Sequence, residues 1–150
     1  MTYMEKDAFA SKIVYFSHPV FSHRTKTERR CMKILKKLNP KEVINPANLG
    51  LRHDIEEQIN RSDAIVGMAV SGKFTYVVGK ELELAEERGA ELFTLMVENK
   101  NDIGPLVEGV PKEIVHLSQE ESKEFVERMI TGDLRESILS LFIGNLGRRF

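Results

Sequence analysis

An α/β fold with a parallel sheet is the fold class that this sequence predicts. Five short apolar runs, rich in β-branched residues, alternate with segments in which apolar residues recur at helical spacing. Proline, glycine and asparagine separate the two kinds of segment. Such alternation predicts helices on both faces of the sheet, and right-handed crossovers favour the doubly wound strand order 2-1-3-4-5. The 150 residues are expected to form one domain.

The first half of the chain is expected to supply two strands and two helices. Residues 1–11 are a lead-in, and residues 12–17 form the first strand. A capped helix with one apolar stripe follows and runs from about 25 to 38. Residues 42–45 form a short second strand, and residues 53–61 form a polar helix with two inward isoleucines. Together these segments predict two β-α units in succession.

The second half repeats the alternation. Residues 64–70 are apolar or glycine throughout and predict a buried third strand, followed by a loop and a helix over 78–88. Residues 91–97 form the fourth strand, and residues 113–117 form the fifth. The segment 98–111, with its asparagines, glycines and prolines, is expected to be a loop. The result is a flavodoxin-like three-layer sandwich with a five-stranded parallel sheet.

Two helices are expected within residues 118–150. Ser118 and Glu121 have the spacing of a capping box and open the first helix, which Gly132 breaks. Asp133 caps a last helix with an apolar stripe, and this helix either covers the sheet or pairs with a second copy in a homodimer.

Composition restricts the function classes. The 22 basic and 23 acidic residues give a net charge of −1, so we expect no nucleic-acid partner and no membrane surface. No apolar run is long enough for a signal peptide or a transmembrane span. Cys31 is the only cysteine, which favours a reduced, cytoplasmic protein. The four histidines and this cysteine have no metal-ligand spacing, so no metal and no cofactor are expected.

The loops after the first three strands meet at the carboxyl edge of such a sheet, where ligands bind in open α/β folds. They form a mixed polar pocket that suits a sugar or a nucleotide. Glu81 and Glu83 lie near the start of the third helix. There they either take part in a reaction as carboxylates or only complement the positive end of the helix dipole. The Gly-x-Gly-x-x-Gly, phosphate-loop and Gly-x-Ser-x-Gly motifs are absent.

Three short motifs follow one another along the first two thirds of the chain. They are Tyr15-Phe16-Ser17, Ser62-Asp63-Ala64-Ile65-Val66, and Val78-Gly79-Lys80-Glu81-Leu82 followed by Ala85. In this order they resemble the nucleoside 2-deoxyribosyltransferase superfamily, and most closely the deoxynucleoside 5′-monophosphate N-glycosidases. The resemblance covers roughly residues 12–97.

The resemblance implies a role for each matching residue. Glu81 matches the carboxylate that attacks the anomeric carbon, and Tyr15 matches the hydroxyl that orients it. Ser22 and Arg24, in the loop 18–24, supply a donor and a charge for a 5′-phosphate. The substrate-binding residues implied or expected are Ser17, His18, Ser22, His23, Arg24, Asn45, Asp54, Ser71 and Gly79. Asp63 and Glu83 are expected to support these residues without contacting the substrate.

Some positions depart from the family pattern. Residues 75–78 read Thr-Tyr-Val-Val where many members carry Asp-x-Gly-Thr, and Glu83 stands where glycine is usual. The expected partner is a nucleoside or nucleotide, and two interpretations stay open. The protein is either an N-glycosidase or deoxyribosyltransferase, or a non-catalytic nucleotide- or nucleotide-sugar-binding protein. A response-regulator-like domain is disfavoured, because no acidic pair follows the first strand.

Overall fold

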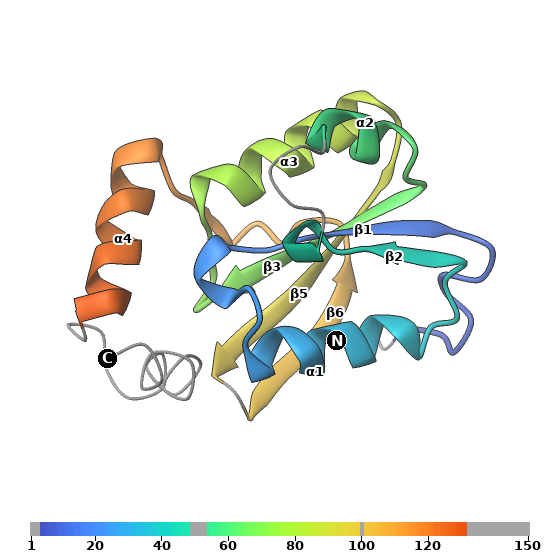
Figure 1. Ribbon diagram of the computed structural model, residues 1–150, viewed down its shortest axis with the longest axis horizontal. Coiled ribbons are helices and arrows are strands. Elements are labelled where there is room, and N and C mark those ends of the chain that lie inside the picture. Colours follow the sequence, from blue (N-terminus) through green and yellow to red (C-terminus); the bar gives the residue numbers. More distant parts are fainter. Residues whose placement is uncertain (1–3, 49–53, 100, 132–150) are drawn as a thin grey trace.

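The middle layer of the fold is a mixed, mostly parallel sheet (Figure 1). The structure is a computed structural model that describes residues 4–48, 54–99 and 101–131, so the expected last helix lies outside the described residues. β1 (Ile13–Ser17) pairs in parallel with β2 (Glu42–Ile44) and β3 (Ala64–Val70), and β5 (Glu91–Asn99) pairs in parallel with β3. The predicted α/β class is confirmed.

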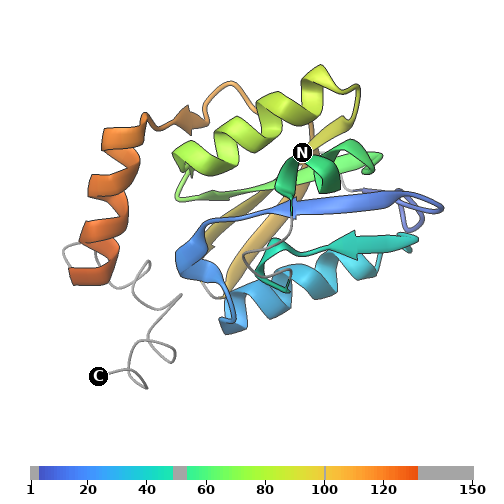
Figure 2. The same cartoon turned by 45° about the horizontal axis from the view of Figure 1, so that its top comes forward.

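Helices cover both faces of this sheet (Figures 1 and 2). α1 (Lys26–Lys36) packs Cys31 and Leu35 against one face. α2 (Ile55–Asn60) and α3 (Tyr76–Glu87) cover the other face with their buried apolar side chains. Each helix thus buries the apolar side that its periodicity predicts.

The prediction of a loop over 98–111 is wrong. β5 extends to Asn99, and β6 (Asp102–Glu108) pairs with it in antiparallel orientation at the edge of the sheet. Gly104 and Pro105 gave this segment the composition of a loop. An edge strand tolerates proline, however, because a strand there has a neighbour on one side only and does not need every backbone N–H for pairing.

The third strand continues into a tight hairpin where a loop was expected. Ser71 and Gly72 have positive φ values of 49° and 73°, as the two central residues of a type I′ turn require. The turn pairs β4 (Lys73–Phe74) with the end of β3. Of the predicted fifth strand, 113–117, only β7 (Val115–His116) forms, and it pairs with β4 in parallel.

Residues 4–11 are more than a lead-in, because Phe9 is fully buried and packs edge-on against Phe93 at 5.0 Å between ring centroids. At the other end, the predicted capping box is confirmed: the backbone N–H of Ser118 donates to Oε1 of Glu121, and that of Glu121 donates to Oγ of Ser118. This box opens α4 (Gln119–Thr131).

α4 lies apart from the two helical layers, beside the carboxyl ends of the strands (Figures 1 and 2). Phe125 faces Phe21 of the β1–α1 loop, with ring centroids 6.2 Å apart, and Lys73 Nζ lies 5.3 Å from the Phe125 ring centroid. The Tyr76 backbone N–H donates to Ser122 Oγ. α4 therefore flanks the edge at which the site was expected. Within the described residues, no helix has the length and apolar character needed to cross a membrane.

Candidate functional site

A carboxylate from α3 meets two hydroxyls from β1 at the carboxyl edge of the sheet. Tyr15 Oη donates to Oε2 of Glu81 at 3.0 Å, and Ser17 Oγ donates to Oε1 at 2.6 Å. Residues 15 and 17 share one face of the strand, because side chains alternate with a period of two. That face is the one that α3 covers. The two residues that the family resemblance pairs, Tyr15 and Glu81, are therefore in direct contact.

Burial and hydrogen bonding shift the pKa of Glu81 in opposite directions. Burial raises the pKa of its carboxyl group, while the hydroxyls of Ser17 and Tyr15 lower this pKa because they donate to the charged form. The net direction is upward. Burial, and then the charge of Glu81, raise the pKa of Tyr15, so its hydroxyl keeps its proton and remains a donor. Such a fixed carboxylate can attack an electrophilic carbon or accept hydrogen bonds from a sugar.

The loop after β1 is held by an internal network built on His18. Its Nδ1 lies 2.7 Å from Ser22 Oγ and its Nε2 lies 2.8 Å from Asn45 Oδ1. All three side chains are buried. Ser22 Oγ also lies 2.6 Å from the Pro19 carbonyl oxygen, and Asn45 Oδ1 also accepts from the Ala47 backbone N–H. Both ring nitrogens of His18, the hydroxyl of Ser22 and the amide oxygen of Asn45 are therefore engaged inside the protein, and these residues shape the loop.

His18 is neutral in this setting. Burial lowers its pKa from 6.5 to about 4, which outweighs the hydrogen bond to Asn45. Glu28 Oε2 lies 3.6 Å from Nε2, beyond hydrogen-bond distance, and does not reverse that effect. The ring stacks on Phe16, with centroids 4.4 Å apart, and meets His23 edge-on. His23 is half-buried, and burial lowers its pKa as well.

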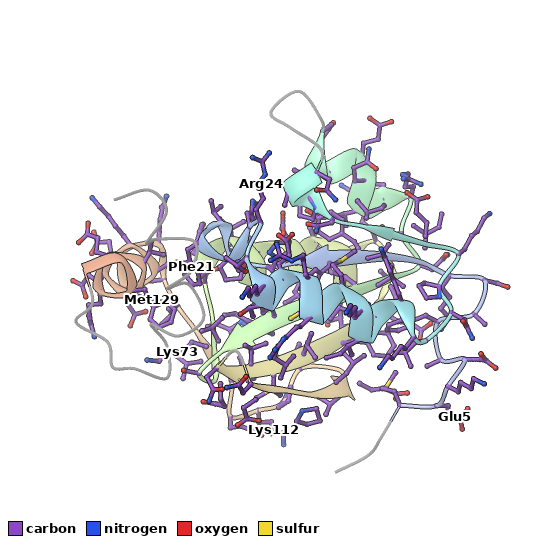
Figure 3. The ribbon with its side chains drawn as sticks, turned by 60° about the horizontal axis from the view of Figure 1, so that its bottom comes forward. Glu5, Phe21, Arg24, Lys73, Lys112 and Met129 are labelled. Atoms are coloured by element: carbon purple, nitrogen blue, oxygen red, sulfur yellow. The ribbon has the colours of Figure 1, made fainter. Side chains whose placement is uncertain are left out.

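Arg24 is the expected phosphate ligand that remains accessible. It is exposed, and Figure 3 shows its side chain extending outward from the end of the β1–α1 loop. Its backbone has a left-handed φ of 64°, and its N–H donates to Glu28 Oε2 at 3.1 Å. Glu28 is a buried residue that sequence reasoning missed. The signal was present, since Thr25 and Glu28 have capping-box spacing, and Thr25 Oγ1 does accept from the Glu28 N–H.

Gly79 and Glu83 do not belong to the Glu81 site. Both line a separate cavity of about 340 Å³ between α3 and residues 110–116. Two residues along a helix correspond to a rotation of about 200°, so neighbours of Glu81 at this spacing face away from it. Glu83 is exposed and forms an ion pair with Lys80 at 3.2 Å. The expected roles of Gly79 in substrate binding and of Glu83 behind the nucleophile are therefore not supported.

Asp54, Asp63 and Ser71, the remaining expected site residues, have structural roles away from Glu81. Asp54 is exposed and caps α2, accepting from the Glu56 backbone N–H at 3.0 Å. Asp63 accepts from the Ile13 N–H at 2.8 Å at the amino end of the sheet, which is the opposite edge. Ser71 is half-buried in the β3–β4 turn, where its backbone N–H donates to Val97. The hydrogen bonds of Glu81 come from Tyr15 and Ser17, and none of these three residues forms one with it in the part of the chain that the structure describes.

The described ranges contain no cluster of three or more histidine, cysteine or acidic side chains that would hold a metal ion. When the chain is compared with protein-family models, with curated proteins and with solved structures, nothing matches.

Proposed function

We propose that this protein cleaves the N-glycosidic bond of a nucleoside or nucleotide, as an N-glycosidase or a deoxyribosyltransferase, with Glu81 as the nucleophile. The observation that carries the proposal is the Glu81 carboxylate held by the hydroxyls of Tyr15 and Ser17 at the carboxyl edge. The same proposal includes a flavodoxin-like arrangement, which the order β2-β1-β3-β5 of the parallel strands supports.

The chemistry follows from what a carboxylate can do at this position. It attacks the anomeric carbon as the bond to the base breaks, and its negative charge stabilises the oxocarbenium-like transition state. The base departs with the bonding electrons and takes up a proton from water. A glycosyl ester remains on Glu81. Water then completes a hydrolysis, or a second base completes a transfer. Tyr15 and Ser17 occupy one lone-pair site on each carboxylate oxygen, and the others remain for the substrate.

Substrate contacts are assigned by accessibility. Arg24 is exposed beside the edge and carries the proposed contact to a 5′-phosphate. His18, Ser22 and Asn45 act indirectly, because their hydrogen bonds hold the loop that presents Arg24.

A second candidate is a non-catalytic nucleotide-binding protein in which Glu81 accepts hydrogen bonds from ribose hydroxyls. The segment 75–78 favours it, because Thr-Tyr-Val-Val lacks the aspartate and glycine that many members of the resembled family carry there.

The test is chromatographic detection of the base released from deoxynucleosides and their 5′-monophosphates. Glu81→Gln keeps the size of the side chain and removes the nucleophile, so we expect at least about a thousandfold loss of turnover with ligand binding retained. Glu83→Gln is the matched control, since Glu83 lies on the same helix but faces the other cavity. Full activity of Glu81→Gln rules out the nucleophile, and binding by the wild type without release of base supports the second candidate.

A further inference from the structure

The outer face of α1 carries only positive charge. Six positions between residues 26 and 37 are exposed, and every one of them is lysine or arginine. They are Lys26, Arg29, Arg30, Lys33, Lys36 and Lys37. The one acidic residue of the helix, Glu28, is buried beneath the loop at its start. α1 forms an outer layer of the molecule in Figure 1, and Figure 3 brings this layer to the front.

These six residues, called here the α1 basic stripe, lie along one side of the helix. Their spacings of three, four and seven residues place them within about a third of the helical circumference. Like charges at such spacings repel each other and destabilise a helix. By contrast, the outer side of α3 mixes signs and pairs Lys80 with Glu83. The repulsion along α1 is relieved when an anion binds.

Five of the six charges in the stripe have no ion-pair partner among the residues that the structure describes. Among the ion pairs of the described ranges, none involves Lys26, Arg29, Lys33, Lys36 or Lys37. The lysines and arginines that do form ion pairs, such as Lys12, Arg61 and Arg88, lie elsewhere in the chain. These five charges are therefore available to an external anion.

We propose that the α1 basic stripe binds the phosphate backbone of double-stranded nucleic acid without reading its sequence. From residue 26 to residue 37 the helix rises about 17 Å. One strand of a duplex presents a phosphate every 3.4 Å along its axis, so about five phosphates fit this length. The proposal is independent of the function proposed for Glu81.

Two other occupants fit the stripe less well. A membrane-surface helix inserts an apolar face into the lipid, but the apolar face of α1, with Cys31 and Leu35, is fully buried against the sheet. Proteins that bind single strands stack bases on aromatic side chains, and the exposed positions of α1 hold only lysine and arginine.

The even charge balance of the whole chain does not oppose this proposal. Net charge sums over all surfaces, whereas a polyanion responds to the charge of the face that it approaches. The expectation of no nucleic-acid partner came from that sum, and the stripe becomes visible only when the exposed positions of α1 are known.

The test is fluorescence anisotropy with a labelled random-sequence duplex of about 20 base pairs, titrated with the full-length protein at several salt concentrations. Combined Lys33→Gln, Lys36→Gln and Lys37→Gln substitutions remove half of the stripe. Combined Lys80→Gln, Lys112→Gln and Lys123→Gln substitutions change the net charge equally on other elements. We expect the wild type to lose at least tenfold in affinity between about 50 and 200 mM salt. The stripe variant should weaken binding at least tenfold, with a salt slope that is shallower by about three.

The outcomes separate the alternatives. Removing like-charge repulsion does not impair folding, so the stripe variant should melt no lower than the wild type. An equal loss of affinity in the control variant overturns the proposal, as does the absence of duplex binding by the wild type at about 50 mM salt, where such contacts are strong. Binding to anionic phosphatidylserine vesicles without binding to the duplex likewise overturns it and identifies a membrane surface instead.

Discussion

Leu82 packs directly onto the backbone of Gly67, in the middle of β3. A Cβ atom added at Gly67 would lie 2.5 Å from Leu82 Cδ1 and 3.3 Å from Phe74 Cε1. Real Cβ atoms essentially never come as close to a neighbour as the first of these contacts. Because Leu82 follows Glu81 in α3, the missing side chain at position 67 sets how closely the helix, and the carboxylate with it, approaches the strand ends.

Gly67→Ala should therefore destabilise the protein by about 1–3 kcal/mol, because Leu82 is buried and must shift to make room. The shift also moves Glu81 away from Tyr15 and Ser17, so activity should fall. Urea denaturation gives the change in the free energy of unfolding. Gly79→Ala is the matched control: its Cβ would come no nearer than 3.7 Å to His116 Nδ1, and alanine should stabilise the helix by about 1 kcal/mol. Equal stability of Gly67→Ala and the wild type would show that the contact is not tight.

The hydroxyl of Tyr15 should govern the titration of Glu81. Tyr15→Phe removes a donor to the charged carboxylate, so the pKa of Glu81 rises further above its ordinary value. A nucleophile must be ionised, so the acidic limb of the kcat/KM profile should move to higher pH, and kcat near neutral pH should fall about tenfold or more.

The same shift can be followed without any assay of turnover, by the ¹³C resonance of the Glu81 carboxyl group across the pH range. Tyr76→Phe is the control, because the contacts of Glu81 come from Tyr15 and Ser17. If the Glu81 titration in Tyr15→Phe coincides with that of the wild type, the hydrogen bond does not stabilise the carboxylate.

The parts of the fold that sequence predicts best are those with an uninterrupted pattern. The apolar run of β3 was predicted with the bounds that the structure gives, 64–70, because every one of its side chains is buried. β6 was missed because proline and glycine have the same local signature in an edge strand as in a loop. β4 was missed because Ser71-Gly72 forms a two-residue turn and not a longer connection.

The candidate site was predictable only in part, for a related reason. Strand and helix periods place Glu81 near the edge, but its contact with Tyr15 spans 66 residues, and only the family resemblance suggested it. The helical period could have shown that Gly79 and Glu83 lie on a different side of the helix from Glu81. The burial of His18 and Ser22 could not be read locally, since it depends on Asn45, which lies 27 residues after His18.

Buried His18 should make the protein less stable in mild acid. The pKa of His18 is about 4 in the folded protein and about 6.5 in the unfolded chain. Above pH 6.5 both states hold a neutral ring, so pH has no effect through this group. As the pH falls from 6.5 towards 4, His18 becomes protonated in the unfolded chain but stays neutral in the folded protein. The free energy of unfolding therefore falls by about 3 kcal/mol. Glu28 and His23 are the titratable groups that face the ring.

The measurement is the free energy of unfolding in urea at pH values from about 4 to 8. His18→Gln keeps a donor and an acceptor for Ser22 and Asn45 but does not titrate, so the difference between wild type and variant should grow steadily towards low pH. His116→Gln changes an exposed histidine and serves as the control. A difference that stays constant across this range would mean that His18 is protonated with equal ease in both states.

Arg24 should carry the preference for a 5′-phosphate. Its side chain is exposed at the end of the loop, while Ser22, the other expected phosphate ligand, has its hydroxyl engaged with Pro19 and His18. A charge-assisted contact to phosphate supports roughly a tenfold preference for nucleoside monophosphates over nucleosides, and Arg24→Ala should abolish it without changing the affinity for nucleosides. Calorimetric titration with matched nucleoside and monophosphate measures both affinities. Arg61→Ala removes an exposed arginine that forms an ion pair with Glu42, and it should leave the preference intact. An equal loss of affinity for both ligands in Arg24→Ala would mean that the residue supports the loop and does not contact the phosphate.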